Sequence, residues 1–381
     1  MRLKKRYFWR VFLIAICVGI IIMAALVAQS YYRLEIQNFT SKDNQKHSYY
    51  IDSCLTIEQV LDMLEEDYDI GSRRDFMLHA KLMHFNYPEP GYYVFDSVIS
   101  NRKVIERLRI GDQTPVEITW KNNIRKPEHL AGQIAQTLRM DSATLLNYMQ
   151  DSLFLAGYGL NKENSRCLFI PNTYQVLWTI TPEQLFDRMQ TEFDKFWTPE
   201  RLEKAENQGI TPLEASILAS IVEDESQKKY DQDTVASLYL NRLHNGWLLQ
   251  ADPTVIYAND MIGTQRVLNR HLKIDHPYNT YVYKGLPPGP LRCPLPQTID
   301  VVLNAPKTKY FYMCANPSLD GRHKFTRNLN EHNRAAHEYH EMMNQRAAQK
   351  RAEEQLAKQL AEQQAAEQAA EAQTAQHTEE Q

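Results

Sequence analysis

Apolar and polar positions follow one another along the chain in blocks that predict an N-terminal membrane helix followed by a mixed α+β body. The first block is an apolar run from Val11 to Ala28 that contains no charged residue. Since a membrane span needs about 20 apolar residues, residues 11–30 are predicted to form a transmembrane helix. Five of the ten residues before it are basic and predict a cytoplasmic N-terminus: Arg2, Lys4, Lys5, Arg6 and Arg10.

A cleaved signal peptide is the alternative interpretation of this block. Such a peptide usually has a shorter apolar region, followed by small residues at the cleavage site. Here the run is longer and ends in Leu26-Val27-Ala28, which lacks a small residue at the first of these three positions. The pattern favours an uncleaved anchor, a polar linker over residues 31–46 and a body outside the cytoplasm.

Residues 47–120 show short strand-like segments interleaved with amphipathic helices, which is typical of a small α+β module. In the segment 47–70, four apolar residues fall at helical spacing on one face: Ile57, Val60, Leu61 and Leu64. Residues 121–344 are mainly helical, with irregular segments rich in polar and aromatic residues. Residues 345–381 form an Ala/Gln/Glu-rich tail, predicted to be an exposed helix or disordered, to which we assign no chemistry.

Composition narrows the functional classes. The 381 residues carry a formal net charge of -4, which argues against a nucleic acid as partner. The five cysteines show no CxxC motif and no metal-ligand spacing. Isolated thiols are the default interpretation, and one or two disulfides stay open. No metal and no cofactor are predicted.

The segment from Thr211 to Glu225 is the most informative one. Thr211 and Glu214 have the spacing of a capping box, and Pro212 suits the first helical position. At 100° per residue, Leu218, Ile221 and Val222 form an apolar stripe. Glu225 projects from the middle of that stripe, whereas Glu223 points to the opposite, small and polar face.

A carboxyl group on an apolar face has a raised pKa, because burial disfavours the charged form. Glu225 is therefore a candidate general acid, as needed to protonate the leaving oxygen of a glycosidic bond. The alternative is that Glu225 pairs with a basic residue, Lys228 or Arg242, at the end of the helix.

Three irregular segments follow, rich in amides, hydroxyls and aromatic rings, and they suit a sugar-binding cleft. Well-capped surface loops are the alternative. The candidate substrate-binding residues are Gln250, Asp252, Thr254, Tyr278, Asn279, Thr280, Tyr281, His323 and Asn333.

Four motifs, in this order and spacing, resemble the endolytic murein transglycosylases, the YceG-like family: "LASIVEDES", "QADPTVIYA", "YNTYVYKGLPPGP" and "HKFTRNLNEHN". The resemblance implies a small LysM-like α+β module over residues 47–120 and a mixed α+β YceG-like catalytic domain over residues 121–344. It implies that Glu225 is the catalytic residue. It also implies an inner-membrane location with a periplasmic body, bound to the lipid bilayer through residues 11–28.

By the same resemblance, the substrate is nascent peptidoglycan, cut at the MurNAc–GlcNAc bond beside peptidoglycan synthases (penicillin-binding proteins). The segment "RCLFIPNTY" departs from the family pattern, because Arg166 and Asn172 stand where acidic residues are usual. Two other functions stay open. One is a muramidase that hydrolyses the same bond with Asp252 as second carboxylate, and the other is a non-catalytic wall-binding scaffold.

Overall fold

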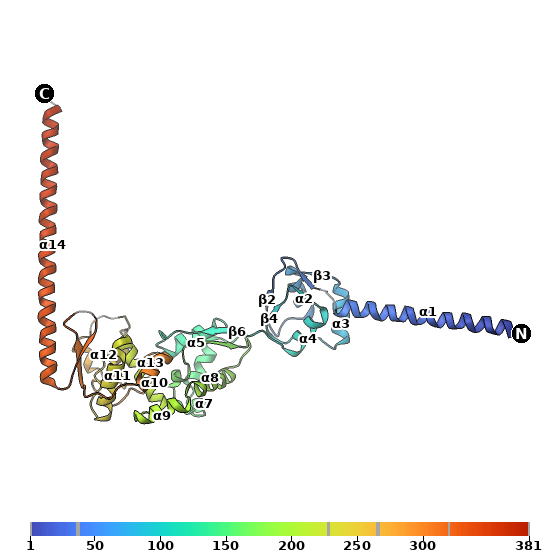
Figure 1. Cartoon of the computed structure of the whole chain (residues 1–381), viewed down its shortest axis with the longest axis horizontal. Coiled ribbons are helices and arrows are strands. Elements are labelled where there is room, and N and C mark those ends of the chain that lie inside the picture. The colour runs from blue at the N-terminus through green and yellow to red at the C-terminus, as the bar shows by residue number, and fades with distance from the viewer. Residues whose placement is uncertain (1, 36–38, 227–228, 264–266, 319–320, 380–381) are drawn as a thin grey trace. The chain divides into compact units, whose positions relative to one another are not determined.

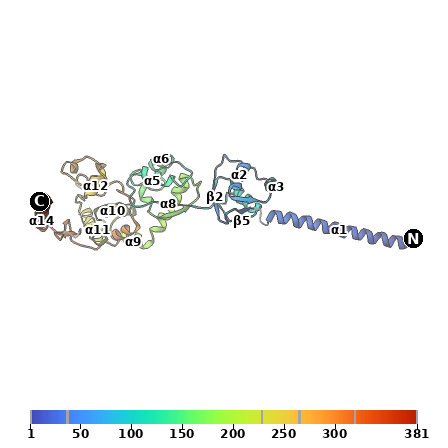
Figure 2. The same cartoon turned by 90° about the horizontal axis from the view of Figure 1, so that it is seen from above.

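The protein divides into two compact units, shown in two orthogonal views in Figures 1 and 2. The computed structural model describes residues 2–35, 39–226, 229–263, 267–318 and 321–379. The first unit comprises residues 1–154 and 172–189, and the second comprises residues 155–171 and 190–381. Residues 121–154 thus lie in the first unit, whereas the domain boundary predicted from the sequence at residue 120 stays a prediction.

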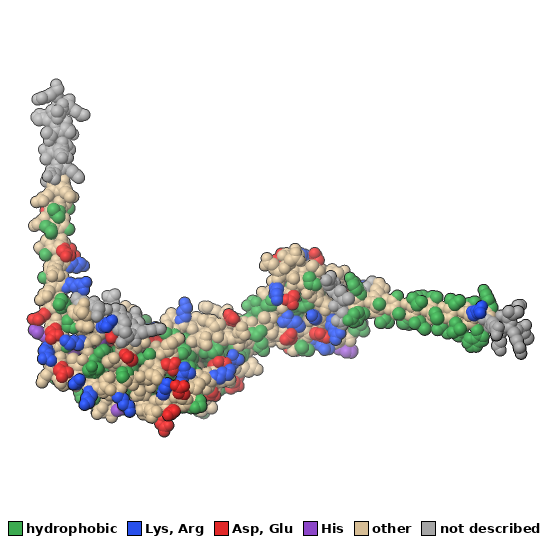
Figure 3. All heavy atoms as spheres, viewed as in Figure 1, with side chains coloured by type: hydrophobic (Ala, Val, Ile, Leu, Met, Phe, Trp, Pro, Cys, Tyr) green, Lys and Arg blue, Asp and Glu red, His purple; other side chains and the backbone are tan. Residues whose placement is uncertain are grey.

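Helix α1, Arg2–Glu35, is long and apolar enough to cross a membrane. The most apolar 18-residue part of its stretch Tyr7–Tyr32 has a mean hydropathy of 3.2, and none of that part is buried within the protein. Figure 3 shows this helix covered with hydrophobic side chains. The predicted span over residues 11–30 lies inside it, and an apolar surface of this length is typical of a single membrane anchor.

The globular part of the first unit begins with strands packed on three helices. Strand β1 lies between β3 and β5 in an antiparallel sheet, in which Phe39 is opposite Ile70 on one side and Ile99 on the other. Strands β2 and β4 form a separate antiparallel pair. The elements are β1 (Phe39–Ser41), β2 (His47–Ile51), α2 (Ile57–Asp67), β3 (Tyr68–Ile70), α3 (Arg73–Leu82), β4 (Gly91–Phe95), β5 (Val98–Ile99) and α4 (Asn101–Ile110).

Helix α2 confirms the predicted amphipathic pattern. Thr56 caps its first turn, and Gln59 completes a capping box by accepting a hydrogen bond from the Thr56 backbone at 2.8 Å. The four residues predicted to share one face are its buried residues: Ile57, Val60, Leu61 and Leu64. They join Phe39, Phe76 and Leu108 in one apolar core.

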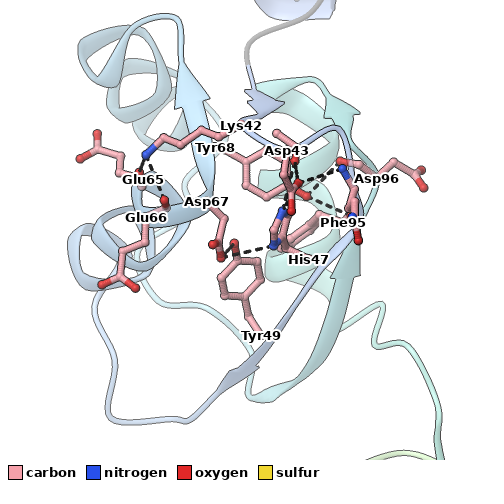
Figure 4. A network of polar contacts seen from close by, with 12 residues as sticks. Lys42, Asp43, His47, Tyr49, Glu65, Glu66, Asp67, Tyr68, Phe95 and Asp96 are labelled. Carbon is pink, nitrogen blue, oxygen red and sulfur yellow. Dashed lines mark hydrogen bonds and ion pairs between the residues drawn. The ribbon is translucent and has the colours of Figure 1, made fainter.

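A polar network ties β1 and β2 to the end of α2 (Figure 4). The imidazole of His47 lies between two carboxylates, with Nε2 2.9 Å from Asp43 Oδ1 and Nδ1 3.6 Å from Asp67 Oδ2. Tyr49 donates to Asp67 Oδ2 at 2.7 Å. Hydrogen bonds from Ser41, the Gln45 backbone and His47 lower the pKa of Asp43 to about 2. The network fixes the β1–β2 turn at the edge of the core.

The remainder of the first unit contains one antiparallel pair of strands with helices beside it. Strands β6 and β7 pair antiparallel although more than 50 residues separate them, and Trp120 stacks on Tyr174 next to this pair. Helices α5 and α6 pack against each other. The elements are β6 (Val116–Thr119), α5 (Pro127–Ala135), α6 (Ser142–Gln150) and β7 (Thr173–Val176), while α7 (Ser152–Ala156) and α8 (Pro182–Phe196) cross the divisions between the units.

The second unit is built around α10, Pro212–Glu225. This helix contacts α9, α11, α12 and α13, and it lies beside α11 in both views (Figures 1 and 2). The other elements are η1 (Ser165–Leu168), α9 (Pro199–Asn207), α11 (Lys229–His244), α12 (Asp252–Ala258), η2 (His271–Lys273), α13 (Pro296–Leu303), β8 (Tyr312–Ala315), β9 (His323–Thr326) and α14 (Leu329–Glu379). The mixed α+β class predicted from the sequence is confirmed.

Candidate active site

The start of α10 is fixed by the predicted capping box. Thr211 Oγ1 accepts a hydrogen bond from the Glu214 backbone at 3.2 Å, and Glu214 Oε2 accepts one from the Thr211 backbone at 2.8 Å. The single apolar stripe predicted for this helix is too narrow. Every residue from Ala215 to Glu223 is buried, because other helices of the second unit surround α10. Ser220 is buried among these helices, and its hydroxyl oxygen accepts a hydrogen bond from the Leu291 backbone at 3.0 Å.

Glu225 ends this buried helix and is partly open to a cavity. Its Oε2 accepts a hydrogen bond from the hydroxyl of Tyr239 at 3.0 Å. Burial raises the pKa of Glu225 to about 7, and the negative charges of Asp252 and Asp224 act in the same direction, against the opposing effects of Tyr239 and Arg242. A carboxyl group with this pKa is partly protonated near neutral pH, and can donate a proton there and accept it back.

Glu223, two residues before Glu225, has a structural role. Its Oε1 accepts from the Leu295 backbone and from Thr298 Oγ1, both at 2.7 Å. Leu295 is the N-cap of α13, so the carboxylate satisfies free donors and complements the helix dipole at that N-terminus. The prediction that Glu223 and Glu225 point in different directions is confirmed.

The cavity beside Glu225 has a volume of about 450 Å³. Four of the predicted substrate-binding residues line it, namely Gln250, Asp252, Tyr281 and His323. Tyr281 donates its hydroxyl proton to Asp252 Oδ1 at 2.6 Å, which links the second and third sequence motifs across the cavity. The full lining is Glu225, Arg242, Gln250, Asp252, Tyr281, Tyr312, Met313, Cys314, Ala315, His323, Leu329 and His332.

The other five predicted residues do not line this cavity. Thr254 and Thr280 are buried and bonded to each other, with their hydroxyl oxygens 2.8 Å apart. Asn279 is fully buried and donates to the carbonyls of residues 272 and 274 at 3.0 and 2.8 Å. Tyr278 stacks on Tyr257, and Asn333 is exposed on α14. The four buried side chains hold the loops in place, so they shape the cavity from behind.

His323 is held at the cavity edge by Asp231. The Asp231 Oδ2 atom lies 2.7 Å from the His323 backbone nitrogen, which donates to it, and 3.2 Å from Nδ1 of the ring. Asp231 is at the start of α11, so this pair connects β9 with the helix that also carries Tyr239 and Arg242.

Arg242 and the β8 strand were not among the predicted site residues. Arg242 donates through Nε to the carbonyl of Phe311 at 2.8 Å and through an Nη atom to the carbonyl of Leu249 at 2.5 Å. It is therefore fixed by the backbone on both sides of the cavity. Sequence reasoning considered Arg242 only as an ion-pair partner of Glu225, and the other candidate partner, Lys228, lies outside the described residues.

Arg166, which departs from the expected motif, is fully buried behind the site. One Nη atom donates to Tyr257 Oη at 3.1 Å and to the carbonyl of Pro290 at 2.5 Å. Its guanidinium also faces the Tyr257 ring, 5.9 Å from the centroid. In this chain the position therefore stabilises the packing of the α12 and 290-loop segments.

Comparison with known proteins identifies the family. The model of the YceG-like family matches residues 49–338, about three quarters of the chain. The chain belongs to the YceG-like family. The matched range of this YceG-like chain includes every cavity residue described above.

Two relatives of this YceG-like chain share one name, endolytic murein transglycosylase. The endolytic murein transglycosylase of Bacillus subtilis (strain 168) is 26% identical over 304 residues, which covers 76% of this chain and 83% of the relative. That of Streptococcus pneumoniae serotype 2 (strain D39 / NCTC 7466) is 26% identical over 293 residues, and the chain spans about half, 53%, of its length. A crystal structure of a YceG-like protein from Listeria monocytogenes is 23% identical, covers 76% of this chain and 99% of its own, and has a TM-score of 0.48.

Proposed function

We propose that this chain is an endolytic lytic transglycosylase, a lyase that cuts the MurNAc–GlcNAc bond of nascent peptidoglycan strands and leaves 1,6-anhydro-MurNAc ends. The cuts would limit the length of the glycan strands. The observation that carries the proposal is the carboxyl group of Glu225, whose pKa is raised to about 7 at the wall of a polar cavity. The names of the relatives support the substrate class.

In the proposed mechanism, protonated Glu225 gives its proton to the oxygen that joins the muramoyl C1 to the next sugar. The C1–O bond breaks, positive charge develops at C1, and the GlcNAc side leaves as an alcohol. The Glu225 carboxylate then takes the proton of the muramoyl 6-hydroxyl, whose oxygen bonds to C1. No water is consumed, and Glu225 ends protonated as it began.

The hydrogen bond from Tyr239 and the positive charge of Arg242 favour the ionised form of Glu225. They would therefore stabilise the carboxylate that exists between the two proton transfers. Burial favours the protonated form that starts the reaction. The balance of the two effects keeps the pKa close to neutral, where one residue can serve as acid and then as base.

A muramidase is the second candidate, because Asp252 lines the same cavity as Glu225. A hydrolase of this kind uses two carboxylates, one of them to activate water or to attack C1. Here the Asp252 carboxylate accepts a hydrogen bond from Tyr281, which suits a positioning role. Mass spectrometry of the digested strands distinguishes the two reactions, since anhydro ends mark transglycosylation and reducing ends mark hydrolysis.

The remaining parts are proposed to bring the enzyme to its substrate. Helix α1 would anchor the chain in the inner membrane, with the basic N-terminus in the cytoplasm and the two units in the periplasm. Residues 47–120 would act as a LysM-like module next to the glycan, and peptidoglycan synthases would be the neighbouring partners.

The substitution Glu225→Gln tests the proposal most directly. It removes the exchangeable proton and keeps the size of the side chain, so cleavage of uncrosslinked strands should fall by at least about 1,000-fold, in line with loss of a general acid–base group. Glu223→Gln is the matched control, because its amide oxygen can still accept the bonds from Leu295 and Thr298.

Product analysis of both variants decides the outcome. Anhydro ends made by Glu225→Gln at the wild-type rate would refute the assignment of the acid. Absence of cut products from the wild-type protein, with strand binding retained, would favour a wall-binding scaffold.

A further inference from the structure

His332 is a cavity residue to which the reaction described above gives no role. It lies in the first turn of α14 and lines the same cavity as Glu225. Its ring stacks on Tyr312 of β8, with centroids 5.4 Å apart and an interplanar angle of 29°. A phenylalanine would make the same stacking contact, so packing alone does not explain an imidazole at this position.

The two ring nitrogens of His332 have different surroundings. Nδ1 is buried and has no hydrogen-bond partner among the residues that the structure describes. Nε2 has no hydrogen-bond partner within that part of the chain either. Because Nδ1 is the buried nitrogen and His332 lines the cavity, we infer that Nε2 is the nitrogen that faces the cavity. A buried polar atom without a partner destabilises the folded state. The Nδ1 atom of His332 therefore destabilises the fold, and no contact within the described residues compensates for it.

The surroundings also determine where the ring carries its proton. Burial and the neighbouring positive charge of Arg242 lower the pKa of His332, so the ring is neutral at neutral pH and bears a single N–H. A proton on Nδ1 would be a buried donor without an acceptor. The tautomer with the proton on Nε2 avoids this, and it presents a neutral hydrogen-bond donor to the cavity.

An apolar surface lies next to this donor. Leu329 precedes His332 by three residues in α14, so both side chains lie on one face of the helix, and both line the cavity. Met313 and Ala315 of β8 line it as well. A neutral donor beside a small apolar wall is complementary to an acetamido group, whose carbonyl oxygen accepts a hydrogen bond and whose methyl group is apolar.

We propose that His332 is a specificity residue that donates through Nε2 to the acetamido carbonyl oxygen of a sugar in the cavity, with Leu329 against its methyl group. The inference rests on the proposed function for the identity of the glycan. It adds a requirement for N-acetylated sugars at this side of the cavity, and it assigns that requirement to one turn of α14.

The test compares three variants on two substrates. His332→Phe keeps the stacking on Tyr312 and removes both nitrogens, whereas His332→Gln replaces the ring with an amide that can donate near the Nε2 position. His337→Phe, on the exposed side of the same helix, is the matched control. The substrates are uncrosslinked glycan strands and the same strands after chemical N-deacetylation.

We expect His332→Phe to lower kcat/KM on N-acetylated strands by about 10- to 100-fold, mainly through a higher KM. His332→Gln should recover part of the loss, and His337→Phe should match the wild type. On N-deacetylated strands, wild type and His332→Phe should be equal. The melting temperature of His332→Phe should be unchanged or higher, because the substitution removes the orphaned nitrogen.

Equal losses on both substrates, or a lowered melting temperature with no rescue by His332→Gln, would show a structural role and overturn the proposal. So would an unchanged kcat/KM of His332→Phe on N-acetylated strands. Binding of N-acetylated strands by Glu225→Gln, with and without His332→Phe, provides a readout that needs no cleavage. Strands that bind through His332 in the wild-type protein but are never cut would refute the proposed function and leave this contact standing.

Discussion

At the scale of single residues, the two glutamates at the end of α10 show how position on a helix determines chemistry. They are separated by one residue, yet Glu223 is bonded to the N-terminus of α13 and Glu225 faces the cavity. Helical periodicity alone was sufficient to predict this difference. The partners of Glu223 could not be predicted, because Leu295 and Thr298 are more than 70 residues away in the chain.

The raised pKa of Glu225 predicts a pH dependence of both activity and stability. The acid form is required to start cleavage, so the rate should fall as the pH rises through about 7. The folded pKa lies above the ordinary value of 4.5, so the folded state binds more protons than the unfolded state between these pH values. Stability should be highest below pH 4.5 with respect to this group and decrease up to pH 7, by at most about 3 kcal/mol.

Denaturant unfolding at several pH values measures this effect as a difference between the wild type and Glu225→Gln. The variant has no group that titrates at this position, so the wild type should lose stability relative to the variant as the pH rises from 5 to 8. A difference that stays constant over this range would contradict the raised pKa.

Glu223 should matter for stability and not for the chemical step. Glu223→Ala leaves the α13 N-terminus and the Thr298 hydroxyl without their acceptor, and the free energy of unfolding should fall by about 3 kcal/mol. The Glu223→Gln substitution should lower the free energy of unfolding by less. Urea unfolding gives the stability, and a Glu223→Ala protein that is as stable as the wild type would contradict the structural assignment.

At the scale of elements, the helix boundaries were more predictable than the neighbours of each helix. Capping chemistry is local, so the beginning of α10 at Thr211 and the buried face of α2 followed from the sequence. The full burial of α10 did not follow, since it depends on four helices that pack around it. Strand β8 was missed for a similar reason, because its residues reach the cavity only through pairing with β9 and contact with α14.

The sequence contains a periodicity signal that distinguishes His332 from its neighbour Asn333. The motif that contains it was recognised, and the neighbouring Asn333 was chosen as a candidate from residue type alone. Helical phase relates Leu329 to His332 and turns Asn333 outward, as the structure has it. Helical periodicity in α14 therefore predicts His332, and not Asn333, as the residue that lines the cavity.

The capping box of α10 allows a prediction for an element. Thr211→Ala removes the side-chain acceptor for the Glu214 backbone and should lower the free energy of unfolding by about 1 kcal/mol. The substituted residue is at the opposite end of the helix from Glu225, so kcat should stay close to the wild-type value. Thermal unfolding combined with a cleavage assay checks both parts, and a large loss of kcat would mean that the helix start controls the position of the acid.

At the scale of the whole molecule, the apolar helix α1 predicts where the protein is found. A chain that lacks residues 1–33 should move from the membrane fraction to the soluble fraction, since the 26-residue apolar stretch is removed. Strands offered in solution should still be cut, because no residue of the cavity belongs to the deleted part. Fractionation of cells followed by detection of the protein makes the measurement, and retention in the membrane would point to a second attachment.

The long helix α14 has a consequence for the resistance of the enzyme to trimming. Its first turn supplies part of the cavity wall, while its residues 341–365 are exposed. A protease that removes the Ala/Gln/Glu-rich end would leave that wall in place, so shortened forms of the protein should remain competent. A break about a dozen residues earlier would detach His332 and Leu329 from the rest of the helix that holds them, and the cavity would lose part of its wall.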